Sequence, residues 1–340
     1  MFSMRLILSL FVVVLTLSIN HVVRALDLSE HPKLKKAVNP LIVEGVYTSE
    51  ELNKLFSSIS LRAEVVKKKE NSAERKLTWG GGYRKGGYRG IFLQNDRIQQ
   101  GAQFWVDNAD DLDRANNELG VEPHVISAII GVETKYGSNK GSHSVFESIA
   151  TFANRGSRLQ TGQLPVFLRL VKKGHLSIDA VGSYSGAMGI PQFISTSYRD
   201  FGYDFSGDGV VDLISNTSDA IGSVANYFKK HHWKKGAPVM VQVQPSSSKA
   251  VSQLNEMAVT KINSRSKPQT TLANISSLID SVPGDMPTTT PLSVFRFLDE
   301  NDKAEYFLGL HNFYVIMRYN HSSLYARAVH ELSEAILQAR

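Results

Sequence analysis

The chain has 340 residues, a net charge of +6 at pH 7 and 42% hydrophobic residues. This composition is that of an ordinary globular protein and excludes a disordered or fibrous one, and the length is enough for two or three sub-domains around a sizeable core. The chain has no cysteine, which excludes disulfides, thiol catalysis, cysteine-based zinc sites and a lipid anchor on an N-terminal cysteine. The modest basic excess suits an anionic partner but is equally common in proteins without one.

Residues 1–25 are predicted to be a signal peptide rather than part of the fold. Arg5 precedes an apolar run from Leu6 to Ile19, which is shorter than a comfortable membrane span. Val23 and Ala25 place small residues where a signal peptidase reads. We expect cleavage after Ala25, export, and no stable membrane span afterwards; an uncleaved N-terminal anchor is the alternative.

The next stretch is expected to be helical, with one unusual loop. Asp27 to Lys69 reads as polar-faced helix, with Ser49 as an N-cap. Thr78 to Gly90, TWGGGYRKGGYRG, lacks the spacing of a phosphate-binding loop. It is either a flexible surface loop or the wall of a groove in which aromatic rings stack on sugars; because the protein is expected to be exported, we predict no nucleic acid partner. Gln100 to Leu119 is expected to be one helix, ended by Gly120.

The stretch from Val121 to Gly137, VEPHVISAIIGVETKYG, carries the strongest chemical signal. It is predicted to be a helix that begins at Pro123. Glu133 follows three isoleucines at helical spacing, which places it on an apolar face: Ile126, Ile129 and Ile130. Burial would raise the pKa of this carboxyl, and an acid still protonated near neutral pH can act as a general acid. The alternative is a structural glutamate that pairs with an arginine or reaches water.

Further helices are expected over Ser144 to Asn154, Leu164 to Lys173 and Asp219 to His232. Between the last two lies Gly182 to Tyr198, GSYSGAMGIPQFISTSY, whose small residues allow close backbone approach. Gln192 is expected just inside the helix that follows. This stretch either lines a pocket or is merely a tight loop.

A candidate calcium loop begins at Asp204. Oxygen-bearing residues alternate there as in an EF-hand, and Gly209 stands at the turn position. Position twelve is Ser215 instead of a bidentate glutamate, so Asp219 would close the site only in a longer loop. The alternative is an Asp/Gly turn that caps a helix beginning at Ser218 or Asp219. The candidate ligands are Asp204, Ser206, Asp208, Val210, Asp212 and Asp219.

The pattern changes after Gly236. Valines alternate with polar residues and methionine from Val239 to Gln244, as in a half-buried strand. Val294 to Leu298 and Tyr306 to Leu308 are further strand candidates, and the Ser/Thr/Pro/Gln-rich residues 245–290 are expected to form long loops. Ser323 to Gln338 is predicted to be a terminal helix.

Five strings in this order together resemble the lytic murein transglycosylase B family: IIGVETKYG, GSYSGAMGIPQF, DFSGDG, DAIGSVANYFKKHHWKKG and FYVIMRYNHSSLYARAV. The resemblance implies an α+β, mainly α fold: a lysozyme-like helical core with a helical lobe and a small β-containing sub-domain. The expected division is signal peptide 1–25, N-terminal helical lobe with a substrate-groove loop 26–110, catalytic core with the EF-hand-like loop 111–236, β-containing sub-domain 237–318, and a C-terminal helix packing on the lobe 319–340.

The resemblance also implies roles for individual residues. Glu133 matches the single catalytic acid/base of the family, and Ser183 and Gln192 match residues that contact substrate. Tyr319 and Tyr88 match tyrosines of the active-site groove. The matches to the family's calcium loop are Asp204, Ser206, Asp208, Val210 and Asp219.

The implied activity is cleavage of the β-1,4 bond between N-acetylmuramic acid and N-acetylglucosamine in peptidoglycan, leaving a 1,6-anhydromuramic end. One carboxylate suffices for it and no cofactor is required, so calcium would be structural. A muramidase would need a second carboxylate, for which Glu147 and Asp200 are candidates; a non-catalytic peptidoglycan-binding protein is the third possibility. We expect a soluble periplasmic monomer whose partner is the glycan strand.

Overall fold

The computed structural model describes residues 26–62, 77–81, 86–263, 266–281, 284 and 286–340. The predicted signal peptide, the Lys67–Lys69 run and residues 82–85 of the glycine-rich stretch lie outside these ranges. In the part that is described, helices predominate and a small antiparallel sheet accompanies them, which confirms the predicted α+β, mainly α class. No helix in this part is long and apolar enough to cross a membrane.

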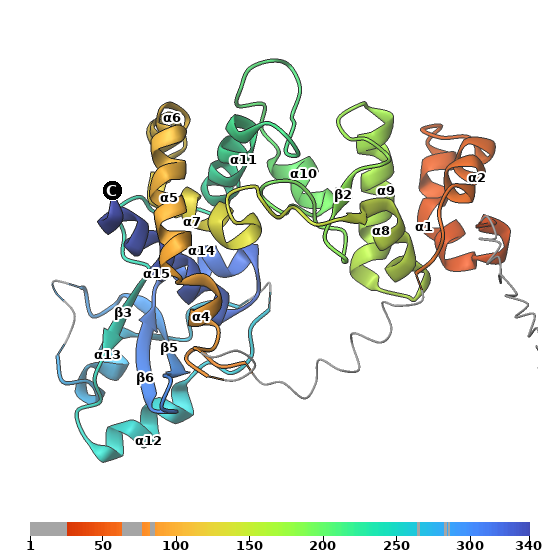
Figure 1. Ribbon diagram of the computed structural model, residues 1–340. Coiled ribbons are helices and arrows are strands. Elements are labelled where there is room, and N and C mark those ends of the chain that lie inside the picture. Colours follow the sequence, from red (N-terminus) through yellow and green to blue (C-terminus); the bar gives the residue numbers. More distant parts are fainter. Residues whose placement is uncertain (1–25, 63–76, 82–85, 264–265, 282–283, 285) are drawn as a thin grey trace, which may run out of the picture.

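The first two long helices lie at one end of the molecule (Figure 1). They are α1 (Pro32–Val43) and α2 (Ser49–Ser57). The N-cap of α2 is Thr48, so the prediction of Ser49 was wrong by one residue. The Thr48 hydroxyl accepts a bond from the Glu51 amide at 3.1 Å, and the Glu51 carboxylate accepts one from the Thr48 amide at 2.8 Å. This reciprocal pair is a capping box, which fixes where a helix begins.

The helix predicted over Gln100 to Leu119 is two helices, preceded by the short α4 (Arg89–Phe92). They are α5 (Asn95–Asp107) and α6 (Ala109–Leu119), and they meet at Asn108, whose backbone leaves the helical region with φ −124° and ψ 30°. The Asn108 side chain donates to the Phe104 carbonyl at 2.8 Å, a local bond of the kind that lets asparagine interrupt helices. Gly120 ends α6 in the left-handed conformation, as predicted.

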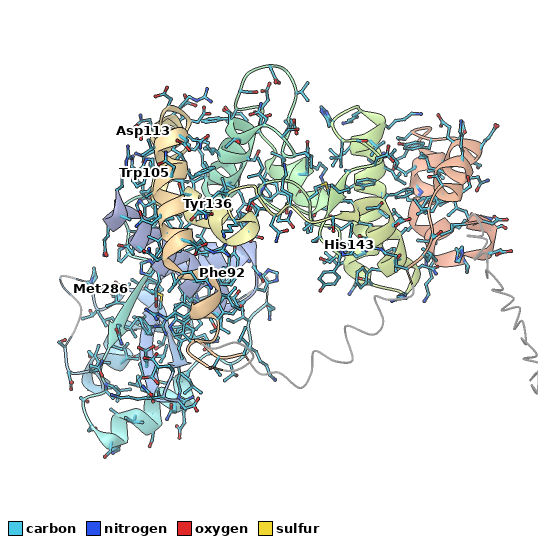
Figure 2. The ribbon with its side chains drawn as sticks, viewed as in Figure 1. Phe92, Trp105, Asp113, Tyr136, His143 and Met286 are labelled. Carbon is cyan, nitrogen blue, oxygen red and sulfur yellow. The ribbon has the colours of Figure 1, made fainter. Side chains whose placement is uncertain are left out.

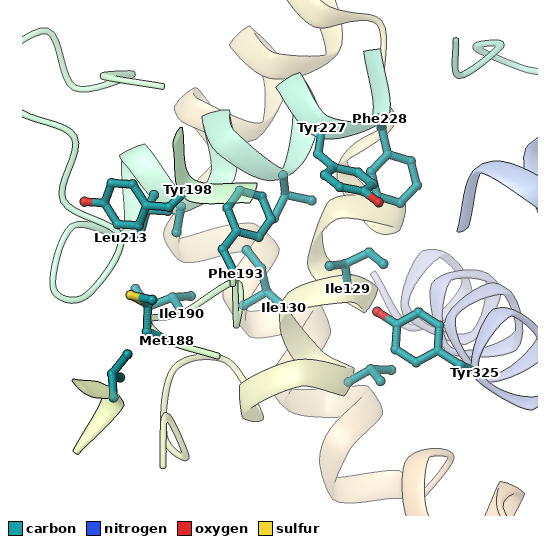
Figure 3. Packing of buried hydrophobic residues seen from close by; sticks show 14 of the residues in the cluster. Ile129, Ile130, Met188, Ile190, Phe193, Tyr198, Leu213, Tyr227, Phe228 and Tyr325 are labelled. Carbon is teal, nitrogen blue, oxygen red and sulfur yellow. The ribbon is translucent and has the colours of Figure 1, made fainter. Parts of the chain in front are cut away.

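Helix α7 (Pro123–Thr134) lies at the centre of the fold. It begins at Pro123 as predicted, and it contacts α5, α6, α11 and α15. Ile126, Ile129 and Ile130 are fully buried, and Ala128 and Val132 are buried as well. The helix is therefore buried around most of its circumference. The prediction of a single apolar face underestimated how much of the helix is buried. Figure 3 shows Ile129 and Ile130 within the packed core around it.

A helical layer beyond α7 connects it to α1 and α2 (Figure 1). It contains α8 (Val145–Asn154), α9 (Arg158–Lys172), α10 (Ser195–Phe201) and α11 (Thr217–Lys230). Helix α9 begins six residues before the predicted Leu164, because the Ser157 side chain caps it by accepting from the Gln160 amide. The short strands β1 (His143–Ser144) and β2 (Val181–Gly182) pair beside α8.

The predicted β-containing region forms a four-stranded antiparallel sheet in the order β3-β6-β5-β4. The strands are β3 (Met240–Val243), β4 (Thr270–Thr271), β5 (Pro291–Leu298) and β6 (Ala304–Gly309). Residues 245–290 were expected to be loops, but they also contain α12 (Ser248–Met257) and α13 (Leu272–Ile275). These helices bury Leu254, Leu272 and Ile275 against the sheet, in a small core of its own.

Two helices complete the described chain, α14 (His311–Tyr319) and α15 (Ser323–Ala339). Helix α15 packs mainly against α7 and α5. The helices of the predicted N-terminal lobe contact two different sets of neighbours: α1 contacts α8 and α9, whereas α5 contacts α7 and α15. The division into five segments stays a prediction.

Candidate active site

Glu133 lies in the last turn of α7, next to the helix end at Thr134. Its side chain is half-buried, and its Oε1 accepts a hydrogen bond from the Tyr325 hydroxyl at 2.6 Å. Burial raises the pKa of Glu133 to about 7, while the hydrogen bond from Tyr325 opposes this shift. The carboxyl is therefore both protonated and ionised in appreciable amounts near neutral pH, which is the condition for giving and taking a proton.

The chain just after Glu133 is held in an unusual conformation. Lys135 and Tyr136 have positive φ angles of 50° and 58°, which non-glycine residues rarely adopt. Tyr136 donates from its hydroxyl to the Arg97 carbonyl at 2.8 Å, and Thr134 donates to the Ile190 carbonyl at 2.9 Å. Figure 2 places Tyr136 just beyond α7. These bonds fix the end of the helix and so fix the position of Glu133.

Tyr325 is the residue of the site that the sequence did not single out. It extends from α15 toward α7 (Figure 3), and its side chain is buried. Its pKa is well above the usual range because of burial and the nearby Glu133 charge, so the phenol stays a hydrogen-bond donor. The segment SSLYARAV was predicted as helix, and nothing in it marks the tyrosine as a partner of a residue 192 positions earlier.

Tyr319 lies next to Tyr325, with the two rings nearly parallel at 12° and 6.4 Å between centroids. Its hydroxyl donates to the Pro191 carbonyl at 2.6 Å. Burial first, and then the negative charge of Glu133, place the pKa of Tyr319 well above its usual range. The structure thus brings this predicted groove tyrosine beside the acid.

The negative charge of Glu133 also acts on Tyr88. Burial, followed by the Glu133 charge, raises the pKa of Tyr88 to about 12. Its ring contacts Phe92 at 5.0 Å between centroids, and its amide donates to the Thr78 carbonyl at 2.9 Å. The glycine-rich stretch is anchored in turn on the sheet, because the Gly80 amide donates to the Leu298 carbonyl at 2.9 Å.

The turn that contains Gln192 is linked to the site through its backbone, whereas Ser183 bonds to its own turn. Gln192 lies in a turn with φ 50°, three residues before α10, so its predicted place inside the helix was wrong. Its side-chain amide donates to the carbonyls of Gly189 at 2.9 Å and Lys140 at 3.1 Å, which holds that turn. The neighbouring carbonyls of Ile190 and Pro191 accept from Thr134 and Tyr319. The Ser183 hydroxyl accepts from the Ala187 amide at 3.0 Å. In the described part of the chain, neither side chain is hydrogen-bonded to Glu133.

The two candidate second carboxylates, Glu147 and Asp200, bond to groups other than those around Glu133. Glu147, on α8, accepts a bond from the Ser60 amide at 3.3 Å. Asp200 is exposed and forms an ion pair with Arg199 at 2.6 Å. Neither is among the groups that shift the pKa of Glu133. The structure does not bring a second carboxylate into the surroundings of Glu133 from these two positions.

The candidate calcium loop is closed by hydrogen bonds to backbone amides. Asp219 is fully buried, and its carboxylate accepts from the amides of Phe205, Ser206 and Asp212 at 2.8–2.9 Å. Asp204 likewise accepts from the amides of Gly207 and Gly209, each at 2.8 Å.

Within the described ranges, no group of three or more acidic or histidine side chains is placed to hold a metal ion. In this arrangement Asp204 and Asp219 accept hydrogen bonds from backbone amides, and the binding of calcium stays a prediction. These bonds are also those expected of an Asp/Gly turn, although the helix cap is Asn216 rather than Ser218 or Asp219.

A helical core that places a half-buried glutamate beside tyrosines is the arrangement that the resemblance to lytic transglycosylases implies. Residues 30–334 match the family model described as the Transglycosylase SLT domain, so the chain belongs to this family. The resemblance seen in the sequence is thereby confirmed.

Individual relatives agree. The chain is 32% identical to membrane-bound lytic murein transglycosylase B of Escherichia coli over 92% of this chain and 85% of the relative. It is similar to the X-ray structure of the catenated lytic transglycosylase SltB1 from Pseudomonas aeruginosa, with 34% identity, a TM-score of 0.80, and coverage of 91% of this chain and 98% of that one. It is also similar to the Escherichia coli lytic transglycosylase Slt35 in complex with calcium, with 30% identity, a TM-score of 0.77, and coverage of 94% and 98%.

Proposed function

We propose that this protein cleaves the β-1,4 bond between N-acetylmuramic acid and N-acetylglucosamine in peptidoglycan and leaves 1,6-anhydromuramic ends. Membership of the transglycosylase family supports the reaction class. One observation supports Glu133 as the catalytic acid. Its carboxyl is half-buried next to a tyrosine donor, and its pKa is raised to about 7.

The first step uses the protonated form of Glu133. The carboxyl gives its proton to the glycosidic oxygen as the bond to the muramic acid carbon breaks, and the N-acetylglucosamine portion departs as an alcohol. Proton transfer from a positioned acid typically accelerates such a step by about 10²–10⁴-fold. The N-acetyl group of the muramic acid assists the cleavage of the glycosidic bond.

The second step uses the carboxylate that the first step leaves. Ionised Glu133 takes the proton from the sugar's own 6-hydroxyl, whose oxygen then bonds to the same muramic acid carbon, displaces the N-acetyl oxygen that assisted the first step, and closes the anhydro ring. This hydroxyl is already tethered to the sugar, which gives it a proximity advantage over free water. Tyr325, which donates to Oε1 at 2.6 Å, holds the carboxyl in place and stabilises this charged form.

We assign the surrounding polar and aromatic groups to substrate binding. Tyr88 and Tyr319, both near Glu133, would contact the sugar rings, and Ser183 and the turn at Gln192 would contact the N-acetyl group and hydroxyls. The positions of the two tyrosines are supported by the effect of the Glu133 charge on their pKa values.

A muramidase is the second candidate function. It would need a second carboxylate roughly 5–9.5 Å from the acid. Glu147 and Asp200, the candidates for that role, bond to Ser60 and Arg199 respectively, which disfavours this reaction. A non-catalytic binder is disfavoured because Glu133 is present and has the raised pKa of an acid catalyst.

No metal takes part in this mechanism. Calcium in the Asp204 loop would be structural: Asp204, Ser206, Asp208 and the Val210 carbonyl would hold it, and Asp219 would have to exchange its three backbone amides for the ion. The proposed place of action is the periplasm, and the proposed partner is the glycan strand, bound by a monomer. The support is the predicted signal peptide and the family.

The test is digestion of purified peptidoglycan sacculi, with the muropeptides identified by mass spectrometry and Glu133→Gln as the control. Anhydro products from the wild type and none from a folded Glu133→Gln variant are expected. Reducing-end products would mean a hydrolase. Activity retained in Glu133→Gln would overturn the assignment of the acid.

A further inference from the structure

An exposed tyrosine follows directly after Ser183. Tyr184 is 50% exposed, and Val181, in strand β2 before the turn, is 47% exposed. An exposed aromatic ring in a turn presents apolar surface to a ligand. The turn joins β2 to the segment that ends at Gln192, and β2 lies between α7 and α8 (Figure 1).

The turn that presents Tyr184 is held by its own hydrogen bonds. The Ser183 amide donates to the Ala187 carbonyl at 2.7 Å, and the Ala187 amide donates back to the Ser183 hydroxyl at 3.0 Å. The Ser185 carbonyl accepts from the side chain of buried Gln160 at 2.8 Å. The backbone on both sides of Tyr184 is therefore fixed.

Gly186 makes the turn pack closely on α8. Its φ is 90°, and an added Cβ would come within 2.7 Å of the Ile149 side chain. Only glycine satisfies both conditions without strain. The ring of Phe152, also on α8, contacts Tyr184 with 6.3 Å between centroids and 59° between planes. This contact supports the Tyr184 ring from one side and leaves about half of the side chain exposed.

We propose that Tyr184, supported by Phe152, forms an outer sugar-binding subsite that holds the glycan strand beyond the residues at the cleaved bond. The inference rests on the proposed function, since the occupant is the substrate strand itself. Sugar rings present C–H faces that pack on aromatic rings, and a ring fixed on a rigid turn binds without much loss of conformational freedom. The adjacent Ser183 makes the subsite continuous with the proposed substrate contacts.

The subsite predicts a dependence on substrate length. A strand long enough to reach Tyr184 gains a contact that a short oligosaccharide cannot make. Loss of one aromatic contact costs about 0.5–1.5 kcal/mol, which corresponds to roughly two- to tenfold in binding. Because the lost contact is remote from the reacting atoms, we expect it to raise KM and leave kcat nearly unchanged.

The experiment compares Tyr184→Ala, Tyr184→Phe and a matched control, Tyr203→Ala. Tyr203 is another exposed tyrosine, 39% exposed, and its ring contacts Phe205. Each variant is assayed on peptide-free glycan strands of graded length, with anhydro ends counted by mass spectrometry and folding checked by thermal melting. On long strands, Tyr184→Ala should raise KM several-fold, whereas Tyr184→Phe and Tyr203→Ala should resemble the wild type. On the shortest cleavable strands, all four proteins should be alike.

Binding gives a second readout that does not depend on turnover. The Kd of long strands is measured by calorimetry in the Glu133→Gln background with and without Tyr184→Ala, and the second substitution should weaken binding several-fold. An unchanged Kd, or an equal rise in KM on short and long strands, would overturn the subsite. A wild type that binds strands but makes no anhydro ends would instead defeat the proposed function, while the Kd comparison would still decide the role of Tyr184.

Discussion

The hydroxyl of Tyr325 donates to Oε1 of Glu133 at 2.6 Å, from a helix whose main partner is the helix that carries the acid. The bond favours the ionised carboxylate and so opposes the effect of burial, which raises the pKa of Glu133 to about 7. The acid therefore has a pKa set by two opposing contributions from the protein, and each can be altered separately.

Tyr325→Phe removes the donor and keeps the ring. The pKa of Glu133 should then move further up, because the charged form loses its hydrogen bond. The alkaline limb of the kcat profile, which reports loss of the proton from Glu133, should shift to higher pH. A profile recorded from pH 5 to 9 tests this. A limb that stays in place, or shifts to lower pH, would contradict the role given to Tyr325.

Glu133→Gln should stabilise the protein at neutral pH. The pKa of Glu133 is raised from 4.5 to about 7 in the folded state. Between pH 4.5 and 7 the folded protein therefore keeps a proton on this carboxyl that the unfolded chain has lost. Wild-type stability from this group is full below pH 4.5 and is lost as the pH rises to 7. Glutamine does not titrate. The difference in the free energy of unfolding between the variant and the wild type should therefore be about 1–3 kcal/mol more favourable to the variant at pH 7.5 than at pH 4.5. Urea unfolding at the two pH values measures this; a difference that is independent of pH would contradict it.

His330, on α15, should produce the opposite pH dependence. Burial lowers its pKa from 6.5, and its Nδ1 has no hydrogen-bond partner in the described structure. The folded state therefore favours neutral histidine, and stability should fall as the pH drops below 6.5. His330→Leu should remove that dependence, so the wild type should lose stability relative to the variant between pH 7 and 5. Parallel unfolding curves of the two proteins over this range would show that His330 does not titrate as described.

Arg327 joins α15 to the sheet. It is 4% exposed and forms ion pairs with Glu305 at 2.8 Å and Glu331 at 2.6 Å. Its guanidinium also lies over the rings of Trp79 at 4.2 Å and Phe307 at 4.3 Å. Arg327→Met leaves two partly buried carboxylates without this partner and should cost about 2–4 kcal/mol.

The exposed Arg296, on β5, supplies the control for that substitution. Arg296→Met should change the free energy of unfolding by less than about 0.5 kcal/mol, as is usual for surface positions. Equal losses in the two variants would mean that the contacts of Arg327 do not stabilise the fold beyond those of any surface arginine.

Removal of divalent ions should leave the protein folded. The Asp204 loop is closed by Asp219 through three backbone amides, and these bonds are sufficient to hold it. EDTA should therefore change Tm by less than about 2 °C, whereas Asp219→Ala, which leaves buried amides unpaired, should cost roughly 2–4 kcal/mol. A large fall in Tm with EDTA that added calcium restores would mean that the loop binds the ion and that Asp219 rearranges.

Local sequence signals singled out Glu133 as the candidate acid, and contacts between distant segments supply the rest of the candidate site. Glu133 could be found because an ionisable residue among isoleucines is conspicuous within one helix. Tyr325 could not be found from the residues alone, because its partner lies 192 positions away and its own surroundings read as an ordinary amphipathic helix. The same holds for Asp219, whose bonds to the amides of Phe205, Ser206 and Asp212 cannot be read from the residue pattern of the loop.

The errors in the elements have local causes that the sequence did carry. Asn108 interrupts a predicted helix through a bond to Phe104, and Thr48 with Glu51 forms a capping box that takes precedence over Ser49. Helix α12 was missed in a Ser/Thr/Pro-rich stretch, although Ser247 caps it and Ala250 and Leu254 recur at helical spacing. In each case a short-range bond between a side chain and the backbone sets the end of the helix.

The separation of Glu133 and Tyr325 along the chain has a consequence for biogenesis. A polypeptide that emerges from the ribosome amino end first presents Glu133 long before residue 325 is available. Until α15 docks against α7, the carboxyl lacks its donor and the helix lacks its main partner. Docking of α15 thus completes the surroundings of Glu133 late in synthesis, and a chain that ends before α15 would carry this carboxyl without its hydrogen-bond donor and without the main partner of α7.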